Sequence, residues 1–78
     1  MKTFFEDHIL HLDLHGVRHH EVKDAVEDFV LTNQNLLPLI IICGNSSKMI
    51  EIVNESLKTI DVVFEETRYG RIRVNTLG

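Results

Sequence analysis

ILHLDLHG at residues 9–16 alternates apolar and polar side chains and ends in a glycine. In an extended chain the three leucines fall on one face, and His11, Asp13 and His15 fall on the other. This period of two predicts a strand over residues 9–15 with one buried face, ended by Gly16.

A helix is predicted directly after this strand, over residues 19–32. Its apolar side chains recur at the spacing of one helical stripe: Val22, Ala25, Val26, Phe29 and Val30. Residues 36–43 then form an apolar run without alternation, which is typical of a strand covered on both faces in the middle of a sheet. Pro38 and Gly44 bound that strand.

The rest of the chain predicts a second helix and a hairpin. Ser46 or Ser47 is the expected N-cap of the helix, whose apolar stripe is Ile50, Val53, Leu57 and Ile60. Residues 61–67 and 71–75 predict two strands. The turn between them is Tyr69-Gly70, with the glycine available for positive φ.

The predicted fold class is therefore α/β, with element order β-α-β-α-β-β in one domain, residues 1–78, and a core of about residues 9–75. Strand–helix–strand units favour parallel pairing with right-handed crossovers. Two helices are too few to cover both faces, so we expect a two-layer sandwich: a four-stranded mixed sheet with both helices on one side. The uncovered side of the strand at residues 39–43 predicts an exposed apolar strip, for which a homodimer is one explanation.

Composition excludes several classes of protein. The chain has 78 residues, 44% of them hydrophobic and 26% charged, which is ordinary for a globular domain. Its apolar runs are too short to span a membrane, and the first ten residues carry charges where a signal peptide is apolar. The single cysteine, Cys43, excludes an internal disulfide and a multi-cysteine zinc cage. We expect a cytoplasmic, reduced domain with no membrane partner.

Charge is distributed unevenly along the chain. The net charge is −4, yet residues 67–78 contain Arg68, Arg71 and Arg73 and no acid. Such an asymmetry can mark an anion-binding end. The alternative is that the arginines only keep an edge strand soluble.

The carboxyl ends of the first two parallel strands should meet at one sheet edge, where α/β proteins bind ligands. Asp13 and His15 lie at the first end, and a carboxylate beside an imidazole suits general acid–base chemistry or phosphate binding. The alternative is that the two residues cap the following helix and tie down the loop. At the second end, the backbone N–H groups and hydroxyls of the Gly44–Ser47 segment, Gly44-Asn45-Ser46-Ser47, could hold an anion. The alternative there is an ordinary turn with a serine cap.

Metal binding and cysteine catalysis receive less support. Five histidines fall between His8 and His20, but His11 and His15 lie roughly 13 Å apart along a straight strand, too far to share one ion. We interpret the histidines as solvated and predict no metal site and no resident cofactor. The participation of a divalent cation stays an open alternative. Cys43 would need a lowered pKa to act as a nucleophile, whereas small buried thiols are common at the end of an apolar strand.

Leu12-Asp13-Leu14-His15-Gly16, followed by Glu21 at the start of a helix, resembles the first motif of the Smr (small MutS-related) domain family. The likeness continues through the apolar strand, the glycine turn, the second helix and the terminal hairpin, over roughly residues 9–75. The family's second motif usually reads HGxG; here Cys43 replaces its histidine and Ser46 its second glycine, and only Gly44 matches.

The resemblance implies a fold similar to the C-terminal domain of translation initiation factor three. It also implies work on RNA or DNA, since Smr domains occur as endonucleases and in ribosome-associated proteins. Asp13, His15 and Gly16 match active-site positions, and Lys48 is the nearest counterpart of a basic residue early in the second helix. Two hypotheses follow. In the first the chain is a nuclease, a hydrolase that uses Asp13 and His15, with phosphates held by Gly16, Gly44, Asn45, Ser46, Ser47, Lys48, Arg68, Arg71 and Arg73. In the second it is a non-catalytic module that binds nucleic acid or a ribosome-associated partner.

Overall fold

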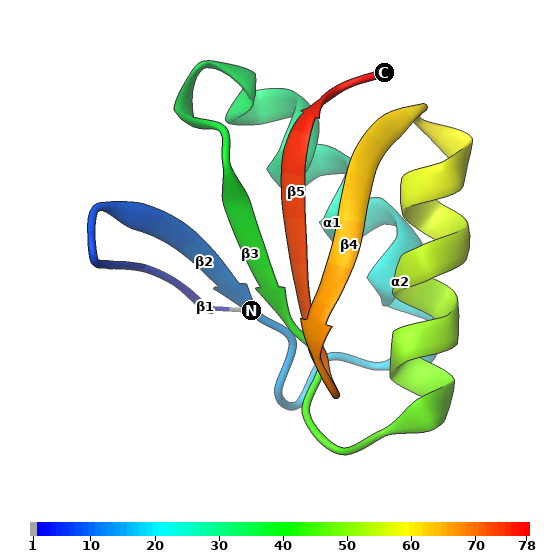
Figure 1. Cartoon of the computed structure of the whole chain (residues 1–78). Coiled ribbons are helices and arrows are strands. Elements are labelled where there is room, and N and C mark those ends of the chain that lie inside the picture. The colour runs from blue at the N-terminus through cyan, green and yellow to red at the C-terminus, as the bar shows by residue number, and fades with distance from the viewer. Residues whose placement is uncertain (1) are drawn as a thin grey trace.

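The computed structural model describes residues 2–78 as five strands and two α-helices (Figure 1). In chain order the elements are β1 (Lys2–Glu6), β2 (Ile9–Asp13), α1 (His19–Thr32), β3 (Leu39–Ile42), α2 (Ser47–Thr59), β4 (Val62–Arg68) and β5 (Arg71–Leu77). A short 3-10 turn, Gln34–Leu36, lies between α1 and β3. The predicted helix over residues 19–32 is confirmed at both ends.

The strands form one mixed sheet in the order β1-β2-β3-β5-β4. β2 and β3 pair in parallel, joined by α1 as the strand–helix–strand pattern predicts, and every other pair is antiparallel. The terminal hairpin inserts β5 between β3 and β4, so that β4 forms one edge of the sheet and β1 the other.

The expectation of four strands is wrong, because residues 2–6 form a fifth. β1 and β2 make a hairpin whose turn residues, Asp7 and His8, both have positive φ, 53° and 67°. Such a two-residue turn matches the twist of paired strands. The sequence of β1, KTFFE, has two adjacent phenylalanines and no clear alternation. Its strand conformation depends on pairing with β2, a tertiary effect that a local pattern does not reveal.

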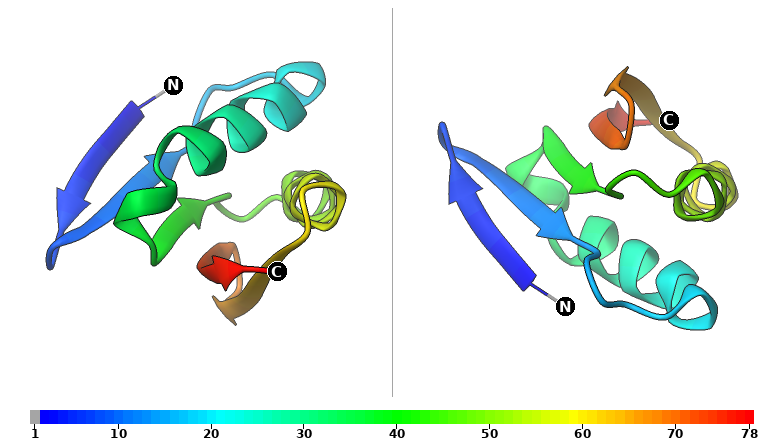
Figure 2. Two further views of the ribbon diagram at one scale, coloured as in Figure 1. Left: turned by 90° about the horizontal axis from the view of Figure 1, so that it is seen from above. Right: turned by 90° about the horizontal axis from the view of Figure 1, so that it is seen from below.

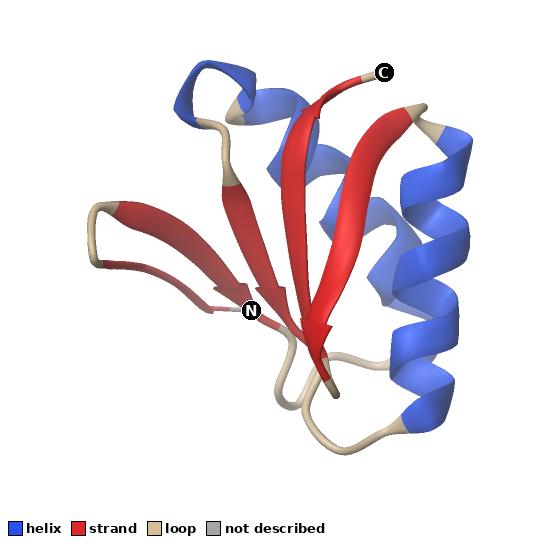
Figure 3. Cartoon of the chain, in the orientation of Figure 1, coloured by secondary structure: helices blue, strands red, loops and turns tan. Residues whose placement is uncertain are grey.

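Both helices lie against the same face of the sheet and against each other (Figures 2 and 3). The core between the two layers contains the leucines of residues 9–16 and the helix stripes. Its fully buried members are Leu12, Leu14, Val22, Val26, Val30, Leu39, Ile41, Val53, Leu57, Ile72 and Val74. The alternation in residues 9–14 therefore indicated the correct buried face.

The face of the sheet away from the helices, called here the helix-free face, is not the exposed apolar strip that we expected. The β-sheet register puts Phe4, His11, Ile40, Arg73 and Glu65 in one row across the five strands. Ile40 is only 6% exposed, because larger side chains flank it on the neighbouring strands. The observation that motivated a homodimer through this face is therefore absent among residues 2–78.

Candidate nucleic-acid interface

Three connections meet at one edge of the sheet, the lower edge in Figure 1. They are residues 14–18 between β2 and α1, residues 43–46 between β3 and α2, and the β4–β5 turn at residues 69–70. Two backbone hydrogen bonds join them: the Leu14 N–H donates to the Ile42 carbonyl (3.1 Å), and the Cys43 N–H donates to the Gly70 carbonyl (2.7 Å). We call this region the loop edge. It confirms that the ends of the two parallel strands lie side by side.

Asp13 organises the backbone of the first loop. Its Oδ1 accepts a hydrogen bond from the His15 N–H at 2.9 Å. β2 ends at Asp13, so His15 lies in the turn that follows and not on the strand as predicted. The His15 side chain is exposed and has no hydrogen-bond partner within residues 2–78. This geometry matches the alternative of tying down the loop. Asp13 does not cap α1, whose N-cap residue is Arg18 with no side-chain hydrogen bond.

Ser46 is the N-cap of α2. Its Oγ accepts a hydrogen bond from the Met49 N–H at 3.1 Å, which satisfies one of the free donors at the start of the helix. Gly44, Asn45 and Ser47 are exposed at the same corner, where further N–H groups of the helix start are unpaired in most helices. Lys48 is exposed in the first turn and lies 3.6 Å from a carboxylate oxygen of Glu51.

The three arginines of the C-terminal hairpin do not act together at the loop edge. Arg68 is exposed beside the turn and makes no ion pair within residues 2–78. Arg71 crosses the helix-free face, where its Nη2 lies 2.9 Å from His11 Nε2 and 3.8 Å from a Glu6 oxygen. Arg73 donates through Nε to Asn75 Oδ1 at 2.8 Å. Of these three arginines, only Arg68 has no side-chain hydrogen bond or ion pair within residues 2–78.

His11 is the histidine that departs most from expectation, since it is 2% exposed. Its ring stacks on Phe4 with centroids 5.0 Å apart. Arginine can only donate, so Nε2 accepts from Arg71, and Nδ1 carries the hydrogen that is donated to the Ile9 carbonyl at 2.8 Å. The prediction that the histidines are solvated is wrong here, because β1 covers the ring.

Within residues 2–78, no group of three metal-binding side chains lies together.

Cys43 has the electrostatics of a structural thiol. It is 7% exposed, and burial, with a smaller contribution from the Glu66 carboxylate, raises its pKa from 9.0 to about 12. A nucleophilic cysteine needs the opposite shift. Cys43 therefore does not supply a thiolate at the loop edge.

The fold brings three further residues to the loop edge that the sequence reasoning missed: Lys2, the cross-strand partner of Asp13; Arg18, exposed at the start of α1; and Tyr69, 62% exposed in the β4–β5 turn. Tyr69 lies in the predicted hairpin turn and Arg18 follows the predicted end of the first strand at Gly16, so both could have been found from the sequence. Lys2 could not, because its position depends on β1. In or near the three connections lie five basic residues, Lys2, Arg18, Lys48, Arg68 and Arg71, and four acids, Asp13, Glu21, Glu51 and Glu66. The net charge of the chain is −4, so the loop edge is less acidic than the rest.

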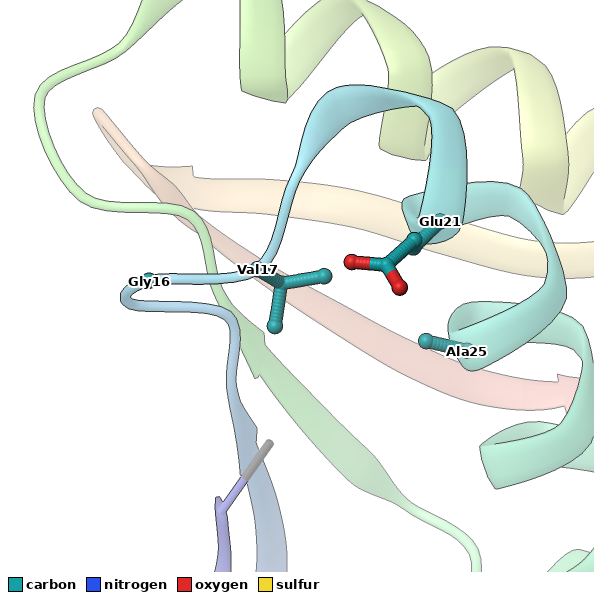
Figure 4. Close-up of a pocket in the computed structure, with 4 residues that line it drawn as sticks. All are labelled: Gly16, Val17, Glu21 and Ala25. Atoms are coloured by element: carbon teal, nitrogen blue, oxygen red, sulfur yellow. The ribbon is translucent and has the colours of Figure 1, made fainter.

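A shallow pocket of about 290 Å³ lies beside this edge, between the first loop and the start of α1 (Figure 4). Gly16, Val17, Glu21 and Ala25 line it, and the Glu21 carboxylate extends over the space between Val17 and Ala25. A carboxylate in the wall repels phosphate, so this pocket does not suit a phosphate group. Glu21 also interacts favourably with the positive end of α1.

No protein-family model matches the chain, and neither a curated protein nor a solved structure shows significant similarity to it. Neither helix within residues 2–78 is long and apolar enough to cross a membrane.

Proposed function

We propose that this chain is an Smr-like domain that binds nucleic acid through its loop edge. The finer assignment of the fold, as similar to the C-terminal domain of translation initiation factor three, is part of the same proposal. Support comes from one observation above all: the turn that carries Asp13, His15 and Gly16 meets the Gly44 turn, joined through the Leu14–Ile42 hydrogen bond. Around this junction lie exposed cationic side chains, including Arg18, Lys48 and Arg68, which suit phosphate contacts.

Binding is favoured over cleavage by the geometry of Asp13. Its Oδ1 holds the His15 backbone N–H and not the imidazole, so no carboxylate orients the ring for proton transfer. Cys43, at the place of the second-motif histidine, has a raised pKa and holds its proton at neutral pH. Cleavage by an RNA or DNA endonuclease is the second candidate, favoured by the exposed His15 imidazole at the same edge.

The test compares two lysines on one helix. Lys48 and Lys58 lie at opposite ends of α2, are exposed to similar extents, and each pairs with a glutamate three positions away, at 3.6 and 3.7 Å. Fluorescence anisotropy of labelled RNA and DNA should show binding that weakens steeply with salt. Lys48→Gln should reduce the affinity and lower the salt slope by about one, whereas Lys58→Gln should leave both unchanged.

Two results would contradict the proposal: no salt-sensitive binding of any nucleic acid by the wild type, or equal losses for the two lysine variants. The same samples, with and without Mg²⁺, address cleavage. Products formed by the wild type and lost in His15→Ala would establish the endonuclease candidate, and equal product in both would remove it.

A further inference from the structure

Tyr69 is an exposed aromatic side chain on a rigid support. It is 62% exposed, while Gly70, the next residue, is buried. Three hydrogen bonds hold the turn: Gly70 N–H to a Glu66 carboxylate oxygen (3.0 Å), Thr67 Oγ1–H to the Arg71 carbonyl (3.3 Å), and Cys43 N–H to the Gly70 carbonyl (2.7 Å). The backbone beneath the ring is therefore fixed before any partner arrives, which reduces the ordering cost of binding.

One cationic side chain beside this turn makes no ion pair within residues 2–78. This is Arg68, which precedes Tyr69 and is exposed. The nearest acid along the strand, Glu66, is bonded to the Gly70 N–H. Because Gly70 also bonds to Cys43 and packs on the Gly44 backbone, this turn lies next to the Gly44 turn and its exposed donors. An aromatic ring beside a free guanidinium fits a base and the phosphate next to it.

We propose that Tyr69 is a stacking platform for an unpaired base, so that the loop edge selects single-stranded nucleic acid. This inference rests on the function proposed above and adds the class of substrate. In a duplex the faces of the bases are already stacked, whereas in single strands and loops they are free to stack on aromatic side chains. Arg68 contacts the adjoining phosphate, and the Gly44 turn lies along the path of the backbone.

The composition of the chain makes the test direct. Tyr69 is the only tyrosine and tryptophan is absent, so the intrinsic fluorescence reports on this one ring. Titration with an unstructured single-stranded RNA should quench the emission, and titration with the matching duplex should not. An RNA of the same length with abasic sites should still bind through its phosphates but quench less.

Variants separate stacking from general affinity. Tyr69→Ala should weaken binding of the single strand by roughly 5- to 150-fold, the effect of one lost base–aromatic stack, and Tyr69→Phe should retain most of the affinity. Phe5→Ala is the matched control, since Phe5 is 64% exposed on β1 and outside the loop edge. Urea unfolding of each variant verifies that it is folded.

The outcomes distinguish this inference from the function on which it rests. If the wild type binds nucleic acid but Tyr69→Ala binds as tightly and the emission does not change, stacking is overturned and the binding function stands. If Tyr69→Ala weakens single strand and duplex equally, the selection of single strands is overturned. If the wild type binds no nucleic acid at all, both proposals fail.

Discussion

Gly70 packs directly against the backbone of Gly44: a methyl group on Gly70 would overlap the Gly44 carbonyl oxygen. The two glycines belong to different connections, the β4–β5 turn and the β3–α2 loop, and both have positive φ, 80° and 74°. Together with the hydrogen bond from Cys43 N–H to the Gly70 carbonyl, this contact sets the position of the hairpin relative to the loop. The hairpin turn and the β3–α2 loop meet this closely because Gly70 carries no side chain; a Cβ on Gly44 would meet nothing within 4 Å.

Gly70→Ala should therefore reduce the free energy of unfolding by more than the cost of placing an alanine at positive φ. Gly16→Ala is the control, because Gly16 has nearly the same φ, 82°, and nothing within 4 Å of an added Cβ. A left-handed alanine costs about 1–2 kcal/mol, so we expect about that loss for Gly16→Ala and about 3 kcal/mol or more for Gly70→Ala. Urea unfolding measures both. Equal losses would show that the contact with Gly44 does not constrain the hairpin.

The periodic parts of the sequence were sufficient to predict the framework. Residues 9–14 place alternate side chains on opposite faces, and residues 19–32 carry a helical stripe, so each local pattern corresponds to the same buried layer that the fold uses. The meeting of the Asp13 and Gly44 loops also followed from the sequence, because a strand–helix–strand unit puts both carboxyl ends at one edge.

What the sequence could not reveal depends on contacts between distant residues. β1 is a strand only in combination with β2, and His11 is buried only because Phe4 and Arg71 reach it; Arg71 lies sixty positions away in the chain. The partners of Arg71 could not be predicted for the same reason, since strand alternation gives the face of Arg71 but not the residues that its long side chain reaches. A local contact also differs from the prediction: Asp13 Oδ1 accepts from the His15 backbone N–H and not from its imidazole.

The Arg71–His11 hydrogen bond should be measurable as an energetic coupling across the helix-free face. His11→Phe keeps a ring to stack on Phe4 but removes the acceptor, and Arg71→Met removes the donor while keeping most of the packing. In a double-mutant cycle of urea unfolding, the double variant should be about 1 kcal/mol more stable than the sum of the single losses predicts. The bond is partly buried and 2.9 Å long, so water replaces it poorly.

Arg73→Met combined with His11→Phe is the control for this cycle. Arg73 lies on the same strand and face as Arg71, but its side chain bonds to Asn75. The loss of unfolding free energy in Arg73→Met should be additive with the loss in His11→Phe. A coupling energy as large for Arg73 as for Arg71 would indicate a general effect of charge on this face. It would contradict a specific Arg71–His11 hydrogen bond.

Cys43 should make stability depend on pH in the alkaline range. Its pKa is about 12 in the folded chain and 9.0 in the absence of burial, so the folded state holds the thiol proton more tightly. The contribution to stability is complete below pH 9, is lost as the pH rises towards 12, and is absent from Cys43→Ala. Urea unfolding at several pH values should show the wild-type stability falling more steeply than that of Cys43→Ala. Parallel curves would contradict the buried, protonated thiol.

The same burial predicts slow chemistry at Cys43. At neutral pH, 5,5′-dithiobis(2-nitrobenzoate) should react with the folded protein far more slowly than with the protein in urea, because the thiolate is the reactive form and the side chain is covered. A rapid reaction of the folded protein would show that the β3–α2 loop opens readily.

Ser46, and not Ser47, should carry the N-cap energy of α2. Ser46 Oγ accepts the Met49 N–H at 3.1 Å, whereas Ser47 is exposed in the first turn and has no side-chain hydrogen bond within residues 2–78. Ser46→Ala should reduce the free energy of unfolding by about 1 kcal/mol. Ser47→Ala should change it by less than about 0.5 kcal/mol, as is usual for an exposed substitution away from such a feature. Both variants replace a serine with alanine at adjacent positions. The comparison therefore separates the loss of the N-cap hydrogen bond from the general effect of removing a serine hydroxyl. If urea unfolding gave the larger loss for Ser47→Ala, α2 would begin one residue later than the structure places it, and the exposed donors assigned to the Gly44 turn would shift with it.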